Sequence, residues 1–333
     1  MSGQTTRVAA ADKNQAVIVP KLRLNDGHQM PVIGLGTYKT GDIESVIRTA
    51  VRCGYRHFDC AHIYGNEADI GRALGAAIAS GEVKRQDLFI TTKVWPNWFA
   101  SGRPTRSARE SLARFGDGID YLDLLLIHWP TPFGQSDTEF YPLDANGQVI
   151  CDETIDLRDV WREFDSIAAT GIARSIGVSN FNSRQLQSIC SVANTRRPAV
   201  NQIESHPYLS NDRLIDYCRR QDIAVTVYSP LARIGYRIER SPLDEPLIRT
   251  LADKYRVSPA QVCIRWQTQR PGVAVIPKSS SEKRLLENIN VFGFELTADE
   301  LRGLASLDCN LRTAKHDHFG SDRHKEWPFA DEY

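Results

Sequence analysis

The feature that most constrains the fold of this chain is a regular alternation of short apolar runs with longer segments of helical periodicity. Several runs are apolar at consecutive positions, as expected for parallel strands that are buried on both faces. We expect eight such strands, at residues 33–37, 57–60, 88–94, 123–129, 175–180, 200–205, 224–229 and 273–278. Strands that alternate with helices predict an α/β protein with a parallel sheet, either open or closed into a barrel.

The segments between these strands carry helix signals. After Asp42 the apolar residues have the spacing of one helix face, and Gly54 ends that pattern. Capping boxes begin two later helices, at residues 258–261 and 297–300. A β-hairpin is predicted before the first strand, from residues 21–24 and 30–33 around an Asn-Asp-Gly turn.

The remaining segments are expected to be loops or tails. Residues 131–154 and 231–244 are too long for plain connections and are predicted to form loops on the face where the strands end. Residues 1–18 are predicted to be a flexible tail without a secretory signal, and residues 19–333 a single domain. The segment after Asp308 shows no periodicity.

Composition excludes several classes of partner. The 41 basic residues equal the 41 acidic ones, so no net charge attracts nucleic acid or a membrane surface. No apolar run reaches the roughly 18 residues that a membrane span requires. The seven cysteines are scattered without a Cys-x-x-Cys pair, which predicts no disulfide framework, no metal site and a cytoplasmic protein.

Four residues near consecutive strand ends carry candidate chemistry. Asp59, Lys93 and His128 each close or interrupt an apolar strand, and Tyr64 follows in the next loop. Reduction of a carbonyl needs a hydride donor and a proton donor. A lysine can lower the pKa of a tyrosine, a carboxylate can hold that lysine, and a neutral imidazole can orient the carbonyl oxygen. Singly, each residue also has a structural interpretation, as a cap, a solvated charge or a core side chain.

Longer motifs resemble the aldo-keto reductases, specifically their monomeric aldehyde and aldose reductase branch. The motifs are GYRHFDCAHIYGNE (54–67), FITTKVW (89–95), DLLLIHWP (123–130), SIGVSNF (175–181), VNQIESHPYL (200–209), VYSPL (227–231) and IPKSSSEKRLLEN (276–288). This resemblance covers residues 21–333 and implies a (β/α)8 TIM barrel. It also implies a catalytic tetrad of Asp59, Tyr64, Lys93 and His128, with Tyr64 as the proton donor.

A nucleotide site is predicted after the last strand. No Gly-x-Gly-x-x-Gly follows the first strand, because Lys39 stands where the third glycine would fall. The segment 278–281 instead opens a helix that bears Arg284, which suits either a phosphate or a plain helix cap. The resemblance implies NADP(H), held by Thr37, Asp59, Ser179, Asn180, Gln202, Tyr228, Ser229, Leu231, Lys278, Ser279, Ser280, Arg284, Glu287 and Asn288. Within this set, Tyr228 corresponds to the residue that stacks on the nicotinamide.

The substrate pocket is expected to be aromatic. The resemblance places these side chains around it: Tyr38, Tyr64, Trp95, His128, Trp129 and Tyr141, with Phe140 beside them. Two positions depart from the family: Tyr38, at the pocket, occupies a position that is often Trp, and the loop after Leu231, which would strap the cofactor, is a few residues shorter than in mammalian aldose-type relatives. In the tail, Arg312, Lys315, His316 and His318 are interpreted as solvated charges, with a carboxylate-bearing substrate as the alternative.

The sequence therefore predicts a monomeric, NADPH-dependent reductase of aldehydes, ketones or aldoses. One alternative is a lyase or isomerase that forms a Schiff base on Lys93. Another is a barrel that binds nucleotide or serves a structural role with little activity.

Overall fold

A closed parallel barrel forms the centre of the protein. The computed structural model describes residues 17–193, 196–233, 238 and 240–330, and within them eight strands pair in sequence order. The backbone amide of Val275 donates to Val32 O, and that of Gly34 donates to Val275 O, both at 2.8 Å. These bonds join the last strand to the first. The strands are β3 (Leu35–Gly36), β4 (His57–Asp59), β5 (Phe89–Val94), β6 (Leu122–Ile127), β7 (Ala173–Ser179), β8 (Val200–Glu204), β9 (Ala224–Tyr228) and β10 (Val273–Val275).

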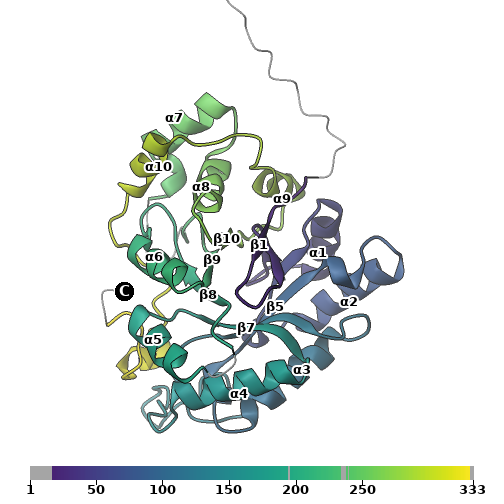
Figure 1. Cartoon of the computed structure of the whole chain (residues 1–333), viewed down its shortest axis with the longest axis vertical. Helices are drawn as coiled ribbons and strands as arrows, with labels where there is room; N and C mark the ends of the chain where they lie inside the picture. Colours follow the sequence, from purple (N-terminus) through teal and green to yellow (C-terminus); the bar gives the residue numbers. More distant parts are fainter. Residues whose placement is uncertain (1–16, 194–195, 234–237, 239, 331–333) are drawn as a thin grey trace, which may run out of the picture.

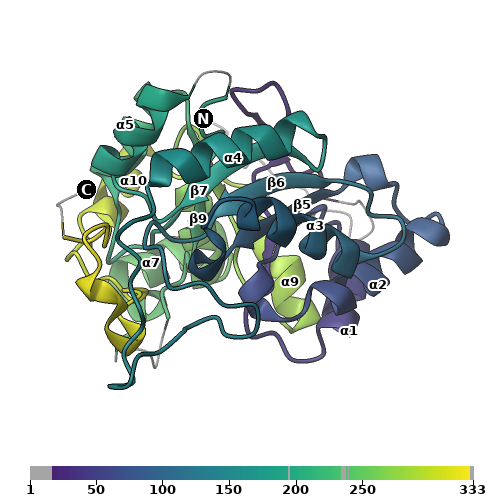
Figure 2. The same ribbon diagram turned by 90° about the horizontal axis from the view of Figure 1, so that it is seen from below.

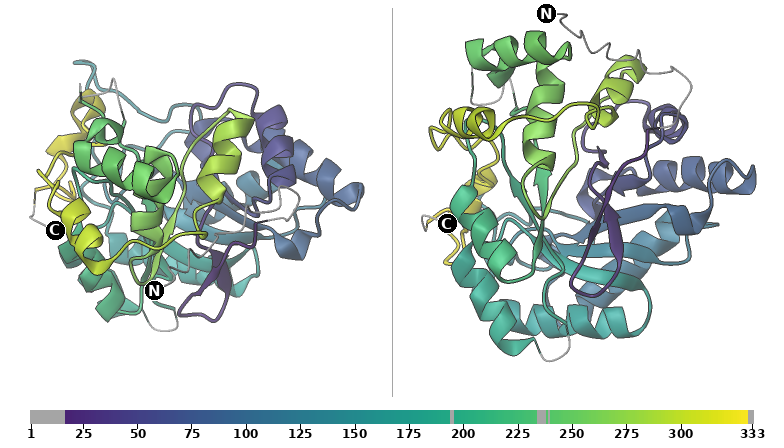
Figure 3. Two further views of the ribbon diagram at one scale, coloured as in Figure 1. Left: turned by 90° about the horizontal axis from the view of Figure 1, so that it is seen from above. Right: turned by 45° about the horizontal axis from the view of Figure 1, so that its top comes forward.

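Helices surround the strands on the outside (Figures 1 and 3). They are α1 (Ile43–Arg52), α2 (Glu67–Ala79), α3 (Arg103–Phe115), α4 (Leu157–Ala169), α5 (Ser183–Val192), α6 (Asp212–Arg220), α7 (Pro246–Tyr255), α8 (Pro259–Thr268), α9 (Glu282–Ile289) and α10 (Ala298–Ala305). The capping boxes at Ser258 and Thr297 begin α8 and α10 as predicted. None of the helices in the described part of the chain has the length and apolar character needed to cross a bilayer.

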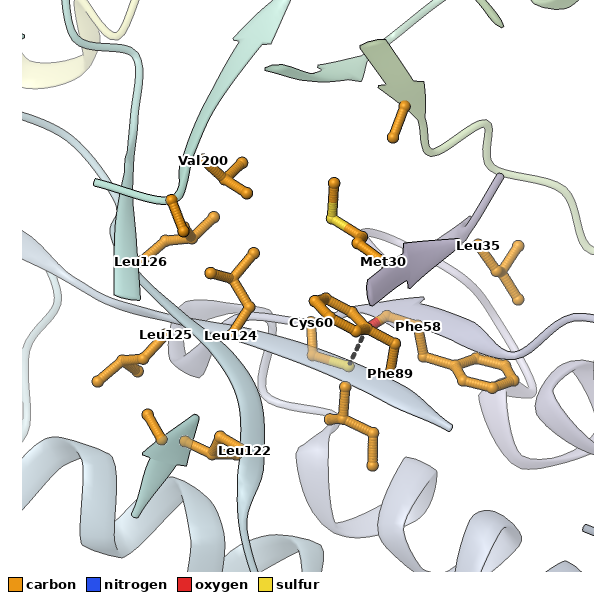
Figure 4. Packing of buried hydrophobic residues seen from close by; sticks show 14 of the residues in the cluster. Met30, Leu35, Phe58, Cys60, Phe89, Leu122, Leu124, Leu125, Leu126 and Val200 are labelled. Carbon is orange, nitrogen blue, oxygen red and sulfur yellow. Dashed lines mark hydrogen bonds between the residues drawn. The ribbon is translucent and has the colours of Figure 1, made fainter. Parts of the chain in front are cut away.

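The predicted hairpin closes the end of the barrel where the strands begin. Its strands are β1 (Lys21–Arg23) and β2 (Gln29–Pro31), and Leu24 N donates to His28 O at 2.8 Å across the turn at residues 25–27. Met30 is fully buried and points into the core that Figure 4 shows around Phe58 and Leu124. The second hairpin strand ends at Pro31, two residues earlier than predicted, because residues 32–34 pair with β10 instead.

The opposite face of the barrel is covered by a long loop and the C-terminal segment. The loop between β6 and α4 forms antiparallel bridges between Phe133 and Cys151 and between Leu143 and Val149. Val149 N donates to Phe319 O, which joins this loop to the C-terminal segment that Figure 2 shows in yellow. The segment contains a short 3-10 helix, η5 (His318–Arg323).

Three predictions about termini and loops have separate outcomes. Residues 1–16 of the predicted tail lie outside the described residues, whereas Val17 packs against the core. Residues 234–237 and 239 of the predicted loop 231–244 also lie outside them, and η4 (Pro242–Asp244) follows. The last strand ends at Val275, before the predicted residue 278, since Pro277 has no amide hydrogen to pair.

Candidate active site

The ends of β4 and β5 bring a lysine, an aspartate and a tyrosine together. Lys93 Nζ donates to Asp59 Oδ1 at 2.6 Å and to the carbonyl of Cys60 at 2.8 Å, and it lies 3.5 Å from Tyr64 Oη. The side chains of Lys93 and Asp59 are almost fully buried, at 0% and 3% exposure. A buried ammonium is tolerated here because a carboxylate and a carbonyl accept its hydrogens. The strand-end residues singled out in the sequence therefore share one cluster.

The position of Tyr64 follows from the loop after β4. A 3-10 turn, η1 (His62–Tyr64), ends at Gly65, whose φ of 68° is readily adopted by glycine. Burial is the largest influence on the phenol and, with the negative charge of Asp59, raises the pKa of Tyr64 well above its ordinary value. The expected lowering of this pKa is therefore wrong for this structure, because burial of the phenol and the nearby charge of Asp59 both raise it.

His128 completes the cluster from the end of β6. Its ring lies edge-on to Tyr64, with centroids 5.8 Å apart, and to Trp95 at 4.9 Å. Burial, followed by the charge of Lys93 and the proximity of His316, holds the pKa of His128 well below its usual value. The imidazole is therefore neutral near pH 7, and its buried Nδ1 has no hydrogen-bond partner among the described residues. A neutral imidazole can orient an oxygen without adding charge.

A row of amides and hydroxyls extends from this cluster along β7, β8 and β9. Gln202 Nε2 donates to Asp59 Oδ2 at 2.7 Å, so Gln202 and Lys93 hold the two carboxylate oxygens. Asn180 Nδ2 donates to Ser179 Oγ and to His128 O, both at 3.0 Å. Tyr228 Oη donates to Asn180 Oδ1 at 2.8 Å, which fixes the plane of its half-buried ring.

The other predicted cofactor residues near this row take different positions. Thr37 Oγ1 donates to Asp59 O at 2.8 Å, so Thr37 braces the same strand end. Ser229 is half-buried and has a φ of 50°, where the chain turns out of β9. Leu231 is half-buried against the barrel core.

A separate cationic segment lies between β10 and α9. Lys278, Ser280 and Arg284 are exposed, and neither Lys278 nor Arg284 has an ion pair within the described ranges. Ser281 is the N-cap of α9, yet its side chain makes no capping bond, so the first amides of the helix remain available to an anion. Ser279 is buried and its Oγ accepts from Ser281 N at 3.1 Å.

The last two predicted residues of this segment lie on α9. Asn288 is buried there, whereas Glu287 lies 3.8 Å from Lys283 on the helix surface. The segment as a whole is chemically suited to a phosphate.

Aromatic side chains cluster beside Tyr64. Trp95 donates through Nε1 to Phe140 O at 2.7 Å, and its ring lies 5.4 Å from that of Tyr141. Trp129 is buried in the same cluster. Tyr38 lies at the rim, 44% exposed, with its ring 5.0 Å from that of Tyr64. The substrate residues predicted from the sequence thus lie in one aromatic cluster.

Two side chains of this pocket were missed or misread in the sequence. His316, interpreted as a solvated charge, is 5% exposed and stacks on Trp129 with centroids 4.2 Å apart and an interplanar angle of 7°. Its Nε2 lies 3.0 Å from Thr131 Oγ1. Phe133 stacks on the other side of His316 at 5.5 Å. Phe133 could have been assigned to this cluster from the sequence, because it is an aromatic residue shortly after His128. Nothing in the polar C-terminal segment indicated that His316 is buried.

A buried carboxylate holds the segment that carries His316. Glu204, at the end of β8, accepts hydrogen bonds from Thr313 Oγ1, from Thr313 N at 3.0 Å and from Ala314 N at 2.9 Å. His206 Nε2 lies 3.2 Å from the same carboxylate. Burial alone raises the pKa of Glu204, but these hydrogen bonds outweigh it and lower the pKa below its ordinary value. Glu204 thereby positions the tail over the pocket.

A parallel barrel with a lysine–aspartate pair and a tyrosine at its strand ends is the arrangement that the sequence motifs implied. A protein-family model described as the aldo/keto reductase family matches residues 32–308. The chain therefore belongs to the aldo/keto reductase family and is an oxidoreductase that acts on small carbonyl compounds.

Individual relatives agree with this assignment. Aldo-keto reductase family 1 member C18 of Rattus norvegicus is 40% identical over 327 residues, which cover 95% of this chain and 99% of the relative. Aldo-keto reductase family 1 member A1 of Sus scrofa is 43% identical over 296 residues, covering 87% and 89%. The solved structure of the aldose reductase from Schistosoma japonicum matches with a TM-score of 0.87 and 37% identity, covering 94% of this chain and all of that one.

Proposed function

We propose that this protein reduces aldehydes, ketones or aldoses to alcohols with NADPH and that Tyr64 is the proton donor. The observation that carries the proposal is the buried contact of Lys93 with both Asp59 and Tyr64, next to a neutral His128. Phenol, ammonium, carboxylate and imidazole are the groups that this reaction requires on the protein side.

The residues around the cluster fit a nicotinamide dinucleotide. The half-buried ring of Tyr228, held by Asn180, offers a stacking surface, and Gln202 and Ser179 offer polar groups beside it. The exposed cations Lys278 and Arg284 at the open N-terminus of α9 suit a phosphate, which favours NADPH over NADH. When bound, the reduced nicotinamide supplies a hydride to the carbonyl carbon.

The chain's own groups then complete the reaction. His128 orients the carbonyl oxygen as a neutral donor, and Tyr64 transfers its phenolic proton to that oxygen as negative charge develops. Tyr64 carries its phenolic proton at neutral pH, because its pKa lies above the ordinary tyrosine value near 10. Lys93, fixed by Asp59, stabilises the phenolate that remains. The aromatic pocket excludes water and accommodates an apolar substrate.

The proposal extends to the form and location of the enzyme. We expect residues 19–333 to act as a single domain and the enzyme to be a monomer. All seven cysteines are free, which fits the reducing conditions of the cytoplasm.

Replacement of Tyr64 by Phe tests the proton donor. We expect Tyr64→Phe to lower kcat for benzaldehyde reduction by roughly 10²-fold to 10⁴-fold, because the acid is lost. NADPH binding, measured by fluorescence titration, should stay within about twofold of the unaltered protein, since the ring remains. Tyr121→Phe is the matched control, because Tyr121 lies outside the site, between Arg85 and Arg174. Reduction at an unchanged rate by Tyr64→Phe would contradict the assignment.

The same assays separate reduction from the two alternative functions, a lyase or isomerase that forms a Schiff base on Lys93 and a barrel that binds nucleotide with little activity. A Schiff base requires a neutral amine with a free lone pair, whereas Lys93 Nζ is bound to a carboxylate and a carbonyl. Borohydride trapping of substrate on the protein without nucleotide would nevertheless support that chemistry over reduction. Binding of NADPH without turnover of any carbonyl compound would support the low-activity barrel.

A further inference from the structure

A second hollow lies on the outer side of the C-terminal segment. It is a groove of about 520 Å³ between the start of α6, the ends of β7 and β8, and the last described residues of the chain. Its apolar walls include Phe181, Leu214, Trp327 and Phe329. Figure 2 shows the C-terminal segment next to α5 on this side of the barrel. None of the four residues of the catalytic cluster lines the groove.

The charges that line this groove are all positive. Arg312 and Lys315 contribute to its surface, and no carboxylate does within the described ranges. The Arg312 guanidinium lies 3.9 Å from the centre of the Phe329 ring and makes no hydrogen bond or ion pair with a described residue. The carboxylates whose charges act on Arg312 include Glu204 and Asp308, and both accept hydrogen bonds from other groups.

Arg312 lacks the carboxylate partner that a half-buried arginine normally has, among the residues that the structure describes. Arg312 is half-buried, and this burial lowers the pKa of its guanidinium. A guanidinium binds a carboxylate with two parallel hydrogen bonds and stacks on aromatic rings, as Arg312 does on Phe329. The apolar walls suit the hydrocarbon part of a ligand. The groove thus combines an anion-binding end with a hydrophobic body.

We propose that this groove is a second ligand site, which binds an organic acid with its carboxylate on Arg312 and its apolar part against Trp327 and Phe329. Asn310 and Lys315 at the groove surface add polar contacts for the carboxylate end. Asn180, which holds Tyr228, also lines the groove, but the four residues of the catalytic cluster do not. The proposal does not depend on the proposed reduction, so occupation of the groove is measurable without turnover.

Binding of phenylacetate to the full chain tests the site. We expect calorimetry to show one phenylacetate bound per chain and neutral phenylacetamide to bind at least about tenfold more weakly, because only the acid pairs with Arg312. Arg312→Met should weaken phenylacetate binding by about tenfold or more, with Arg312→Lys intermediate because a point charge remains. Arg302→Met is the control, since Arg302 is exposed on α10 and pairs with Asp299. Equal binding of the acid and the amide would overturn the proposal.

Two further variants locate the bound acid. Trp327→Phe should abolish the change in tryptophan fluorescence on binding, whereas Trp95→Ala, which alters the aromatic cluster beside Tyr64 and not the groove, should leave phenylacetate affinity within about twofold. Loss of binding in Trp95→Ala but not in Arg312→Met would place the acid beside Tyr64 and refute the groove. A chain that ends at Ala330 should bind as the full chain does. Binding only after this truncation would show that the chain's own terminus occupies the groove.

Discussion

Replacement of Glu204 by Gln removes the charge that holds the C-terminal segment on the barrel. The carboxylate accepts hydrogen bonds from Thr313 and Ala314 and lies beside His206. A glutamine of the same size keeps one acceptor oxygen but turns an NH2 group toward other donors. Loss of one or two charge-assisted hydrogen bonds, each contributing about 1.5–3 kcal/mol, lowers the free energy of unfolding by about 1.5–6 kcal/mol.

The functional effect of this change is expected in the substrate pocket. Ala314 precedes His316 by two residues, and His316 stacks on Trp129 at 4.2 Å. A loosened segment therefore loses an aromatic wall of the pocket, which should raise KM for benzaldehyde by about tenfold while kcat changes by less than about threefold. The catalytic cluster itself is untouched, since Glu204 contacts none of its residues.

Urea unfolding and steady-state kinetics together check this reasoning. Glu110→Gln, which removes a carboxylate from exposed ion pairs on α3, is the control and should change stability by no more than about 0.5 kcal/mol. If Glu204→Gln unfolds at the urea concentration of the unaltered protein and keeps its KM, then the carboxylate does not position the segment. A fall in kcat equal to the rise in KM would also contradict a purely positioning role.

Three further predictions address the cofactor, the packing and the pH dependence. Lys278→Met with Arg284→Ala should reduce the preference for NADPH over NADH at least about tenfold, and equal affinity of the unaltered protein for both nucleotides would contradict the phosphate site. Gly71→Ala should destabilise the protein by about 3 kcal/mol or more in thermal unfolding, because the added Cβ would lie 1.9 Å from a carbonyl oxygen at the end of α3. Gly41→Ala is the control and should leave stability unchanged, because a Cβ at Gly41 would meet nothing within 4 Å. Burial lowers the pKa of His57 to about 4, below its unfolded value near 6.5, so protonation favours unfolding and His57 alone should lower stability by about 2 kcal/mol from pH 7 to pH 5. Burial also lowers the pKa of His62 and His316, so the total fall should be larger; a urea midpoint that stays constant over this range would show otherwise.

Much of the fold is determined by local patterns in the sequence. The alternation of strands and helices is confirmed because each apolar run and each helix face must be buried, whatever its neighbours are. The capping boxes at Ser258 and Thr297 begin α8 and α10 because their hydrogen bonds lie within four residues. Strand ends at Asp59 and Lys93 could be aligned from sequence because parallel neighbours end on the same face of the barrel.

Tertiary structure alone decided the contacts that join distant segments. Glu204 meets Thr313 across 109 positions and His316 meets Thr131 across 185, and no local periodicity encodes such pairs. The pKa of Tyr64 was misjudged for the same reason, since its direction depends on how deeply the phenol is buried and on how closely Asp59 approaches Lys93. Local periodicity and hydrogen bonding thus made the elements predictable, whereas burial and electrostatics between remote residues emerged only once the barrel had brought them together.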